Sequence, residues 1–183
     1  MKKIIGLIFA IICISSSCFA AGGQKDIGVV LIGSSEYKED HMISVMVDIM
    51  TTENPSGVVM HVGADEQSKY QEFWFTKGKL DADNPTPQNF LEYANYTGYD
   101  KVLFLVVKDP VVDTKKEGLF GTVESKRVSV EIKGYLVGHE KLIGSYTSVN
   151  EDDSRQSELR ARRGALKKSI KYIHEKSKND YIL

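Results

Sequence analysis

Three short runs of apolar, mostly β-branched residues constrain the fold of this chain more than any other feature of its sequence. They are "DIGVVLIG" (26–33), "GVVMHVG" (57–63) and "KVLFLVV" (101–107). A nearly continuous apolar run of this length is typical of a strand that is buried on both faces of a sheet covered by helices. The three runs therefore predict an α/β fold.

Helix signals occupy the segments between these runs. Ser34 and Ser35 offer N-cap oxygens to a helix that the spacing of its apolar residues extends to about Met50. Further on, Thr86 can act as a cap, and Pro87 stands at the first helical position, where its missing N–H costs nothing. We expect both helices to pack on the sheet.

A strand pair of a different kind follows the third run. The segment "RVSVEIKGYLVG" (127–138) alternates apolar and polar residues, and "LIGSYTSV" (142–149) returns after a short turn. This pattern predicts an antiparallel hairpin with one face toward water. The connection 109–125 could hold a short strand of its own. The apolar face of the first strand consists of Val128, Val130 and Ile132.

The last segment of the chain predicts a basic amphipathic helix capped by Asp153 or Ser154. Its apolar stripe is predicted to pack on the sheet, with the cations facing solvent and His174 on the polar part. Contact of the basic side with anionic lipid or an acidic protein is the alternative. The stripe consists of Leu159, Leu166, Ile170 and Ile173, and the far side carries Arg160, Lys167, Lys168 and Lys171.

The first twenty residues have the pattern of a secretory signal. Lys2 and Lys3 precede an apolar run of 11 residues (4–14), and small residues lead to a cleavage position after Ala20. The run is shorter than the roughly 20 residues of a membrane-spanning helix. Cys18 follows three serines, so lipid attachment at this cysteine is an alternative to plain cleavage.

Cleavage after Ala20 leaves a chain without cysteine, because Cys13 and Cys18 both lie in the leader. This excludes disulfides, thiolate metal sites and cysteine nucleophiles from the mature protein. Residues 154–183 carry nine basic and three acidic groups, whereas residues 21–153 carry 13 basic and 22 acidic groups. The basic helix therefore has an acidic body as an intramolecular partner, and export argues against a nucleic-acid partner.

Two groups of residues are candidate contact sites. The order strand, Ser34–Ser35, helix could hold an anion at a helix N-terminus, with helix capping as the alternative. The stretch 65–78, which fits a helix or a short strand, contains the densest aromatic cluster of the chain. Its rings could form a partner-binding patch or could pack in the core. They are Tyr70, Phe73 and Trp74.

Catalytic and metal-binding patterns do not support an enzyme. The segment "VVLIGSSE" (29–36) loosely resembles the opening block of SGNH-type hydrolases, but the D-x-x-H motif that such an enzyme needs is missing, as is a G-x-S-x-G elbow. No pair of histidines stands at metal-ligand spacing. We therefore expect no catalytic residues, no cofactor and no metal site. The histidines are His41, His61, His139 and His174.

The order of the predicted elements resembles the small α/β module of bacterial envelope proteins, as found in the amino-terminal domain of TolB, in CsgG and in LpoB. The stretches that carry the resemblance are "YDKVLFLVV", the hairpin "RVSVEIKGYLVGHEKLIGSYTSV" and the helix "SELRARRGALKKSIKYI". The family's hairpin often turns through an Asp and a Thr-Gly, whereas this one uses Gly138, His139 and Glu140. The resemblance implies an envelope protein that contacts other proteins, and it implies no catalytic residues.

These observations predict a signal peptide (1–20) and a single exported α/β domain (24–178), with a mixed sheet of about five strands and helices packed on it. The expected function is a non-enzymatic adaptor or structural protein of the bacterial envelope, periplasmic or secreted, that contacts another envelope protein. A periplasmic protein that binds a small ligand or anion at Ser34 and Ser35 is the second hypothesis, and a serine hydrolase is the third.

Overall fold

The computed structural model of the protein describes residues 23–78, 82–117 and 123–183. The predicted signal, including Cys18 and the cleavage position after Ala20, lies outside the described residues. Cleavage and lipid attachment therefore stay predictions.

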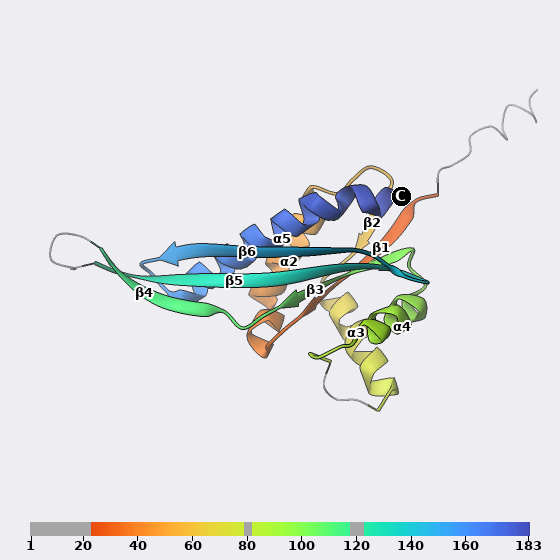
Figure 1. Cartoon of the computed structure of the whole chain (residues 1–183), viewed down its shortest axis with the longest axis horizontal. Helices are drawn as coiled ribbons and strands as arrows, with labels where there is room; N and C mark the ends of the chain where they lie inside the picture. Colours follow the sequence, from red (N-terminus) through yellow and green to blue (C-terminus); the bar gives the residue numbers. More distant parts are fainter. Residues whose placement is uncertain (1–22, 79–81, 118–122) are drawn as a thin grey trace, which may run out of the picture.

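The fold is built on one mixed, open sheet of six strands (Figure 1). The strands β2, β1, β3 and β5 are neighbours in this order. One side of β5 pairs with β3 and, further along, with β4, and the other side pairs with β6. The first three strands are parallel and the others antiparallel. The bounds are β1 (Lys25–Ile32), β2 (Val58–His61), β3 (Lys101–Val107), β4 (Val111–Glu117), β5 (Val123–Gly138) and β6 (Leu142–Ser154).

Helices cover both faces of this sheet. One face carries α2 and α5, and the other carries α3 and α4 (Figure 1). The predicted α/β class, mixed sheet and carboxy-terminal hairpin are confirmed, and the connection 109–125 supplies the sixth strand as β4. The helices are α2 (Asp40–Thr52), α3 (Ala64–Thr76), α4 (Pro87–Thr97) and α5 (Glu158–Ile182), with a short 3-10 helix, η1 (Ser35–Lys38).

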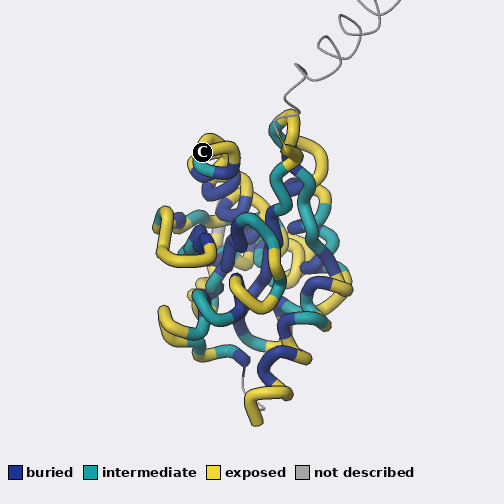
Figure 2. The backbone as a smooth tube through the Cα atoms, turned by 90° about the vertical axis from the view of Figure 1, so that its right-hand side faces the viewer, coloured by how far each residue is buried: buried dark blue, intermediate teal, exposed yellow. Residues whose placement is uncertain are grey.

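The two central strands, β1 and β3, are buried on both faces, as their sequence runs predict. Val29 and Leu103 belong to the core under α2 and α5, whereas Val30 and Phe104 belong to the core under α3 and α4. Successive side chains of a strand point to opposite faces, so each strand contributes to both cores. The buried backbone accordingly lies in the middle of the molecule (Figure 2).

Two elements differ from the sequence-based expectation. The helix predicted from Ser34 to Met50 is divided, because Tyr37 turns into the core beside Gly33 and Glu39 is extended (φ −68°, ψ 147°) before α2 begins. β2 is an edge strand rather than a strand buried on both faces, since it pairs with β1 alone and only Val58 is fully buried.

The last helix starts later than predicted and uses a broader contact face. Because β6 continues to Ser154, the cap is Ser157, whose Oγ accepts a hydrogen bond from the Arg160 N–H (3.2 Å). The stripe prediction is confirmed for its last three residues, which are fully buried: Leu166, Ile170 and Ile173.

The prediction is wrong for Leu159 and His174. Leu159, in the first turn of α5, is 49% exposed because it lines the groove between α2 and α5 and not the sheet. His174 is fully buried, because α5 passes the end of α2 there and its Nε2 lies 3.2 Å from the Glu53 carbonyl oxygen. In the part of the chain that the structure describes, no helix is long and apolar enough to cross a membrane.

Two leucines of the same helix test this packing. Truncation of buried Leu166 to Ala should lower the free energy of unfolding by about 2–5 kcal/mol, because it removes apolar contacts and leaves a cavity. Truncation of exposed Leu159 to Ala should change it by less than about 0.5 kcal/mol. Urea unfolding of both variants measures the difference, and equal effects would contradict the assigned contact face.

Candidate binding site

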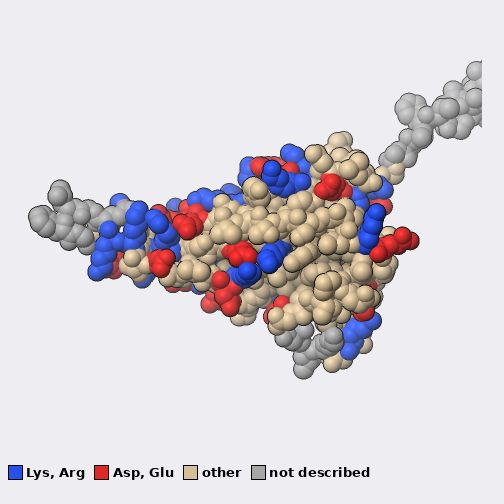
Figure 3. Space-filling view, in the orientation of Figure 1, with Lys and Arg blue, Asp and Glu red and all other residues tan. Residues whose placement is uncertain are grey.

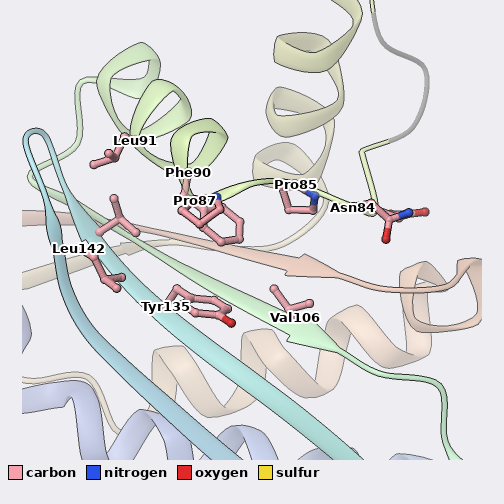
Figure 4. Close-up of a pocket in the computed structure, with 10 residues that line it drawn as sticks. Asn84, Pro85, Pro87, Phe90, Leu91, Val106, Tyr135 and Leu142 are labelled. Atoms are coloured by element: carbon pink, nitrogen blue, oxygen red, sulfur yellow. The ribbon is translucent and has the colours of Figure 1, made fainter.

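An open cavity of about 280 Å³ lies between α4, the loop before it and the strands β3, β5 and β6 (Figure 4). Most of its lining is apolar. Leu91, Val106 and Tyr135 are half-buried, and Leu142 is 50% exposed, so solvent reaches the apolar walls. The residues that line it are Asp83, Asn84, Pro85, Pro87, Phe90, Leu91, Val106, Tyr135, Val137 and Leu142.

Local sequence signals position α4 at this cavity. Thr86 and Asn89 form the capping box, in which the Thr86 N–H donates to Asn89 Oδ1 (3.0 Å), and Pro87 opens the helix as predicted. The helix then places the Phe90 ring against Phe104, with the ring centroids 4.3 Å apart. The wall that α4 contributes is therefore held by both a cap and a buried aromatic contact.

The opposite wall belongs to the turn of the β5–β6 hairpin. Asn95 Nδ2 donates to the carbonyl oxygen of His139 (2.8 Å), so α4 is tied to this turn. Leu142, at the start of β6, stands on the cavity side of the turn (Figure 4). The two walls are thereby fixed relative to each other.

The charge of the lining is balanced within the protein. Asp83 is the charged residue among those that line the cavity, and it forms an ion pair with Lys38. Apolar surface without a free charge suits an uncharged, apolar occupant better than an ion.

Ser34 and Ser35, the predicted anion contacts, do not line this cavity. Ser34 stands at the N-cap of η1 without a side-chain capping bond, and η1 is only four residues long. The helix N-terminus that the anion hypothesis requires at these serines is therefore not formed; α2 begins after Glu39 instead.

The three predicted contact aromatics lie in the core, which was the alternative expectation. Tyr70, Phe73 and Trp74 are 4%, 2% and 3% exposed and pack in the cluster under α3 and α4. The Tyr70 hydroxyl donates to the Ala82 carbonyl oxygen (3.1 Å). These rings do not form a surface patch; Phe75, on the same helix, is the exposed ring.

The residues of the cavity were not predicted as a site from the sequence. One signal was available: Tyr135 and Leu142 are large apolar residues in a hairpin whose alternation assigns Tyr135 to the wet face. An apolar side chain at such a position indicates that something covers it, and here α4 covers it in part.

The buried carboxylate of Glu66 joins α3 to α4. Glu66 is 4% exposed and accepts hydrogen bonds from the hydroxyls of Tyr93 (2.7 Å) and Tyr99 (2.9 Å). Burial, together with this carboxylate, raises the pKa of both hydroxyls, so they remain donors. Tyr99 stacks on His61, which pairs with Asp26 (2.9 Å).

Each Glu66 oxygen accepts a hydrogen bond within this network, which therefore links α3 to α4 and to Tyr99 beyond it. The Tyr99 ring can take this position only because residue 28 is a glycine, since a Cβ there would lie 2.7 Å from Tyr99 Cδ2. Within the described residues, no group of three His, Cys, Asp or Glu side chains is placed to hold a metal ion.

Removal of one hydroxyl tests the network. Tyr93→Phe should lower the free energy of unfolding by about 1–3 kcal/mol, because buried Glu66 loses a hydrogen-bond donor. Tyr96→Phe, at a ring that is 49% exposed on the same helix, should change it by less than about 0.5 kcal/mol. Chemical denaturation measures the free energy of unfolding of both variants. An unchanged value for Tyr93→Phe would exclude a stabilising role for the hydrogen bond.

The basic face of α5 pairs with the acidic body, as its charge asymmetry predicts. Lys171 Nζ lies 2.8 Å from Glu53 Oε1, and Lys168 Nζ lies 2.6 Å from Asp152 Oδ1. Arg162 contacts Glu36 on η1. These ion pairs give several of the cations a partner within the protein.

His174 is enclosed where α5 passes the end of α2. Its Nε2 lies 3.2 Å from the Glu53 carbonyl oxygen, and its Nδ1 lies 3.4 Å from the Tyr181 hydroxyl. Burial lowers the pKa of His174 below its ordinary value of 6.5. The folded protein therefore holds this imidazole neutral at pH values where the unfolded chain protonates it.

The stability of the protein should decline as the pH falls below about 6.5, because protonation of His174 favours the unfolded chain. The stability that neutral His174 contributes is fully present above pH 6.5 and is lost as the pH falls toward the pKa of His174 in the folded state. His174→Gln removes this titration. The free energy of unfolding of the variant should fall less between pH 7.5 and pH 5 than that of the parent protein, by urea denaturation at both pH values. Equal declines would exclude His174 as the cause.

No family model and no curated protein matches this chain. Solved structures to which it is similar include the lipoprotein GNA1162 from Neisseria meningitidis, with 16% identity, coverage of 85% of this chain and 99% of that one, and a TM-score of 0.48. The hypothetical protein CT253 from Chlamydia trachomatis has 11% identity, coverages of 86% and 98%, and a TM-score of 0.43.

A PelC dodecamer from Paraburkholderia phytofirmans has 14% identity, coverages of 84% and 88%, and a TM-score of 0.41. Similarity at this level carries no information on what the cavity binds. The resemblance to the module of TolB, CsgG and LpoB remains a prediction from the order of elements.

Proposed function

We propose that this protein is a non-enzymatic module of the bacterial cell envelope that holds another envelope protein through the cavity beside α4. The envelope location rests on the signal pattern of residues 1–20. The binding role rests on one observation, the open apolar cavity between α4 and the β5–β6 hairpin. Protein interfaces commonly depend on a large side chain that fills such a cavity.

The size and chemistry of the cavity favour a protein segment as its occupant. Its volume of about 280 Å³ lies just below that of pockets that enclose a small molecule, which span roughly 300–1,000 Å³. This space suits one large apolar side chain. Asp83 is engaged by Lys38, so an ionic group would find no free counter-charge in the lining.

The exposed wall makes the cavity accessible to such a segment. Leu142 presents half of its surface to solvent, and Pro85 and Pro87 restrict the backbone of the opposite rim. A partner side chain that enters would bury Leu91, Val106 and Leu142 further, and a preformed rim lowers the entropy cost of binding.

Selection of peptides from a random library for binding to the purified protein tests this role. Those that bind should carry a large apolar residue, and calorimetry should show a negative heat-capacity change. Leu91→Lys, which places a charge in the cavity wall, should weaken their binding at least about tenfold, or about 1.4 kcal/mol.

Gln88→Lys is the matched control, because it adds the same charge to an exposed position of α4 that does not line the cavity. Its affinity for the selected peptides should equal that of the parent. Peptides that bind the Leu91→Lys variant as tightly as the parent would contradict the proposed site.

A further inference from the structure

A second concave surface lies between α2 and α5, on the face of the sheet opposite to the cavity. This groove has a volume of about 730 Å³ and is open to solvent. Leu159, in the first turn of α5, lines it and is 49% exposed. The α5 wall of the groove therefore offers an accessible apolar side chain.

Three cations of α5 line the groove beside this leucine. They are Arg160, Arg163 and Lys167. At 3.6 residues per turn they lie within about 60° of one side of the helix and span about 10 Å of its axis. The Arg160 guanidinium contacts the side-chain oxygen of Gln156. Among the residues that the structure describes, none of the three cations has a carboxylate within ion-pair distance.

The spacing of these cations sets like charges against one another. Arg160 and Arg163 are three residues apart, and Arg163 and Lys167 are four apart. Like charges at these spacings are neighbours on the helix surface and repel. An anionic group that enters the groove would contact the cations and remove this repulsion.

The acidic residues of the lining do not cancel this charge. Asp152 lies so close to Gly164 that a Cβ there would have no room, and its carboxylate pairs with Lys168 (2.6 Å). Asp48 is exposed on the α2 wall. The positive charge of the groove is therefore concentrated on its α5 wall.

Charges elsewhere on the protein are more evenly mixed. On the face shown in Figure 3, basic side chains lie next to acidic ones. On β5, Arg127 Nε lies 3.0 Å from Asp153 Oδ1, and later on α5, Lys171 pairs with Glu53. The row of cations along the groove is thus a local feature of the first turns of α5.

We propose that the groove between α2 and α5 binds an acidic segment of another protein. Carboxylates of this segment accept hydrogen bonds from Arg163 and Lys167, and an apolar side chain of the segment packs on Leu159. Charge complementarity selects the occupant, because charge-assisted hydrogen bonds from guanidinium and ammonium groups favour carboxylates. This inference goes beyond the proposed function and does not rest on the cavity.

The shape of the site favours a polypeptide over a lipid surface. A bilayer is flat and cannot follow the walls of a groove between two helices, whereas single side chains can enter it. Asp48 on the α2 wall would also face the phosphates of such a surface. Leu159 among the cations calls for an occupant with acidic and apolar groups within about 10 Å of each other, as a short peptide has.

A library of peptides rich in aspartate and glutamate, selected for binding to the purified protein, tests the groove. The selected peptides should carry an apolar residue among their acids. Arg163→Ala combined with Lys167→Ala should weaken their binding at least about tenfold, because two charge-assisted contacts are lost. Leu159→Ala should weaken it about threefold or more, because an apolar contact is lost. Fluorescence anisotropy measures these affinities.

Lys176→Ala combined with Lys178→Ala is the matched control, because it removes the same charge from exposed positions of α5 that do not line the groove. Its affinity should equal that of the parent. Leu91→Lys, in the cavity wall, should also leave the affinity unchanged, which separates this test from that of the proposed function. Circular dichroism verifies that each variant is folded.

Three outcomes would overturn the proposal. The first is a selection that yields no binding peptide. The second is a variant with Arg163→Ala and Lys167→Ala that binds the peptides as tightly as the parent. The third is binding of phosphatidylglycerol vesicles, in place of the peptides, through these two cations.

Discussion

The burial of β1 and β3 on both faces is the constraint on which the rest of the structure depends. Two adjacent strands without a polar face cannot meet water on either side, so the chain must supply a helix layer above and below them. α2 and α5 form one layer, and α3 and α4 form the other. The position of the cavity follows from how far these layers reach.

The two helix layers are unequal. α5 has 25 residues and packs along β5 and β6, whereas α3 and α4 have 13 and 11 residues and cover the sheet only around β1, β3 and the hairpin turn. The rest of β5 on that face carries polar residues such as Ser129 and Lys133. The cavity lies at the border between the covered and the uncovered part of the sheet. On this face of β5, the polar residues end there and the apolar ring of Tyr135 follows.

The carboxyl end of α5 is held to the sheet by hydrogen bonds from β3 and β6. Buried Lys101, at the start of β3, donates to the carbonyl oxygens of Asp180 (2.6 Å) and Tyr181 (3.2 Å). A cation at these last carbonyls is favoured by the helix dipole. The Tyr146 hydroxyl donates to the Asp180 carboxylate (2.5 Å) from β6. The basic helix is thus held by the sheet itself.

Local patterns allowed most of the elements to be predicted, because their signals lie within one segment. The alternation at Val128 and Val130 placed the hairpin, and Thr86 with Pro87 placed the start of α4. Features that depend on neighbours distant in sequence were missed. His174 is buried because α5 passes the end of α2 there, and a neighbour that lies so far away in the sequence is not visible in the helix pattern.

The cavity was missed for the same reason. Its walls come from separate parts of the chain, and neither Leu91 nor Leu142 is unusual within its own segment. The predicted sites, in contrast, were chosen as local clusters. The aromatic cluster around Trp74 is needed in the core, and Ser34 lies beside a turn rather than at the start of a long helix.

Photo-crosslinking in the living envelope tests most directly whether the cavity is the contact site. A photoreactive residue would replace Leu91 in the cavity wall or, as the comparison, Phe75, which is 73% exposed on α3 away from the cavity. A discrete cross-linked protein is expected from position 91 and not from position 75. Cross-linking from position 75 alone would contradict a binding role for the cavity.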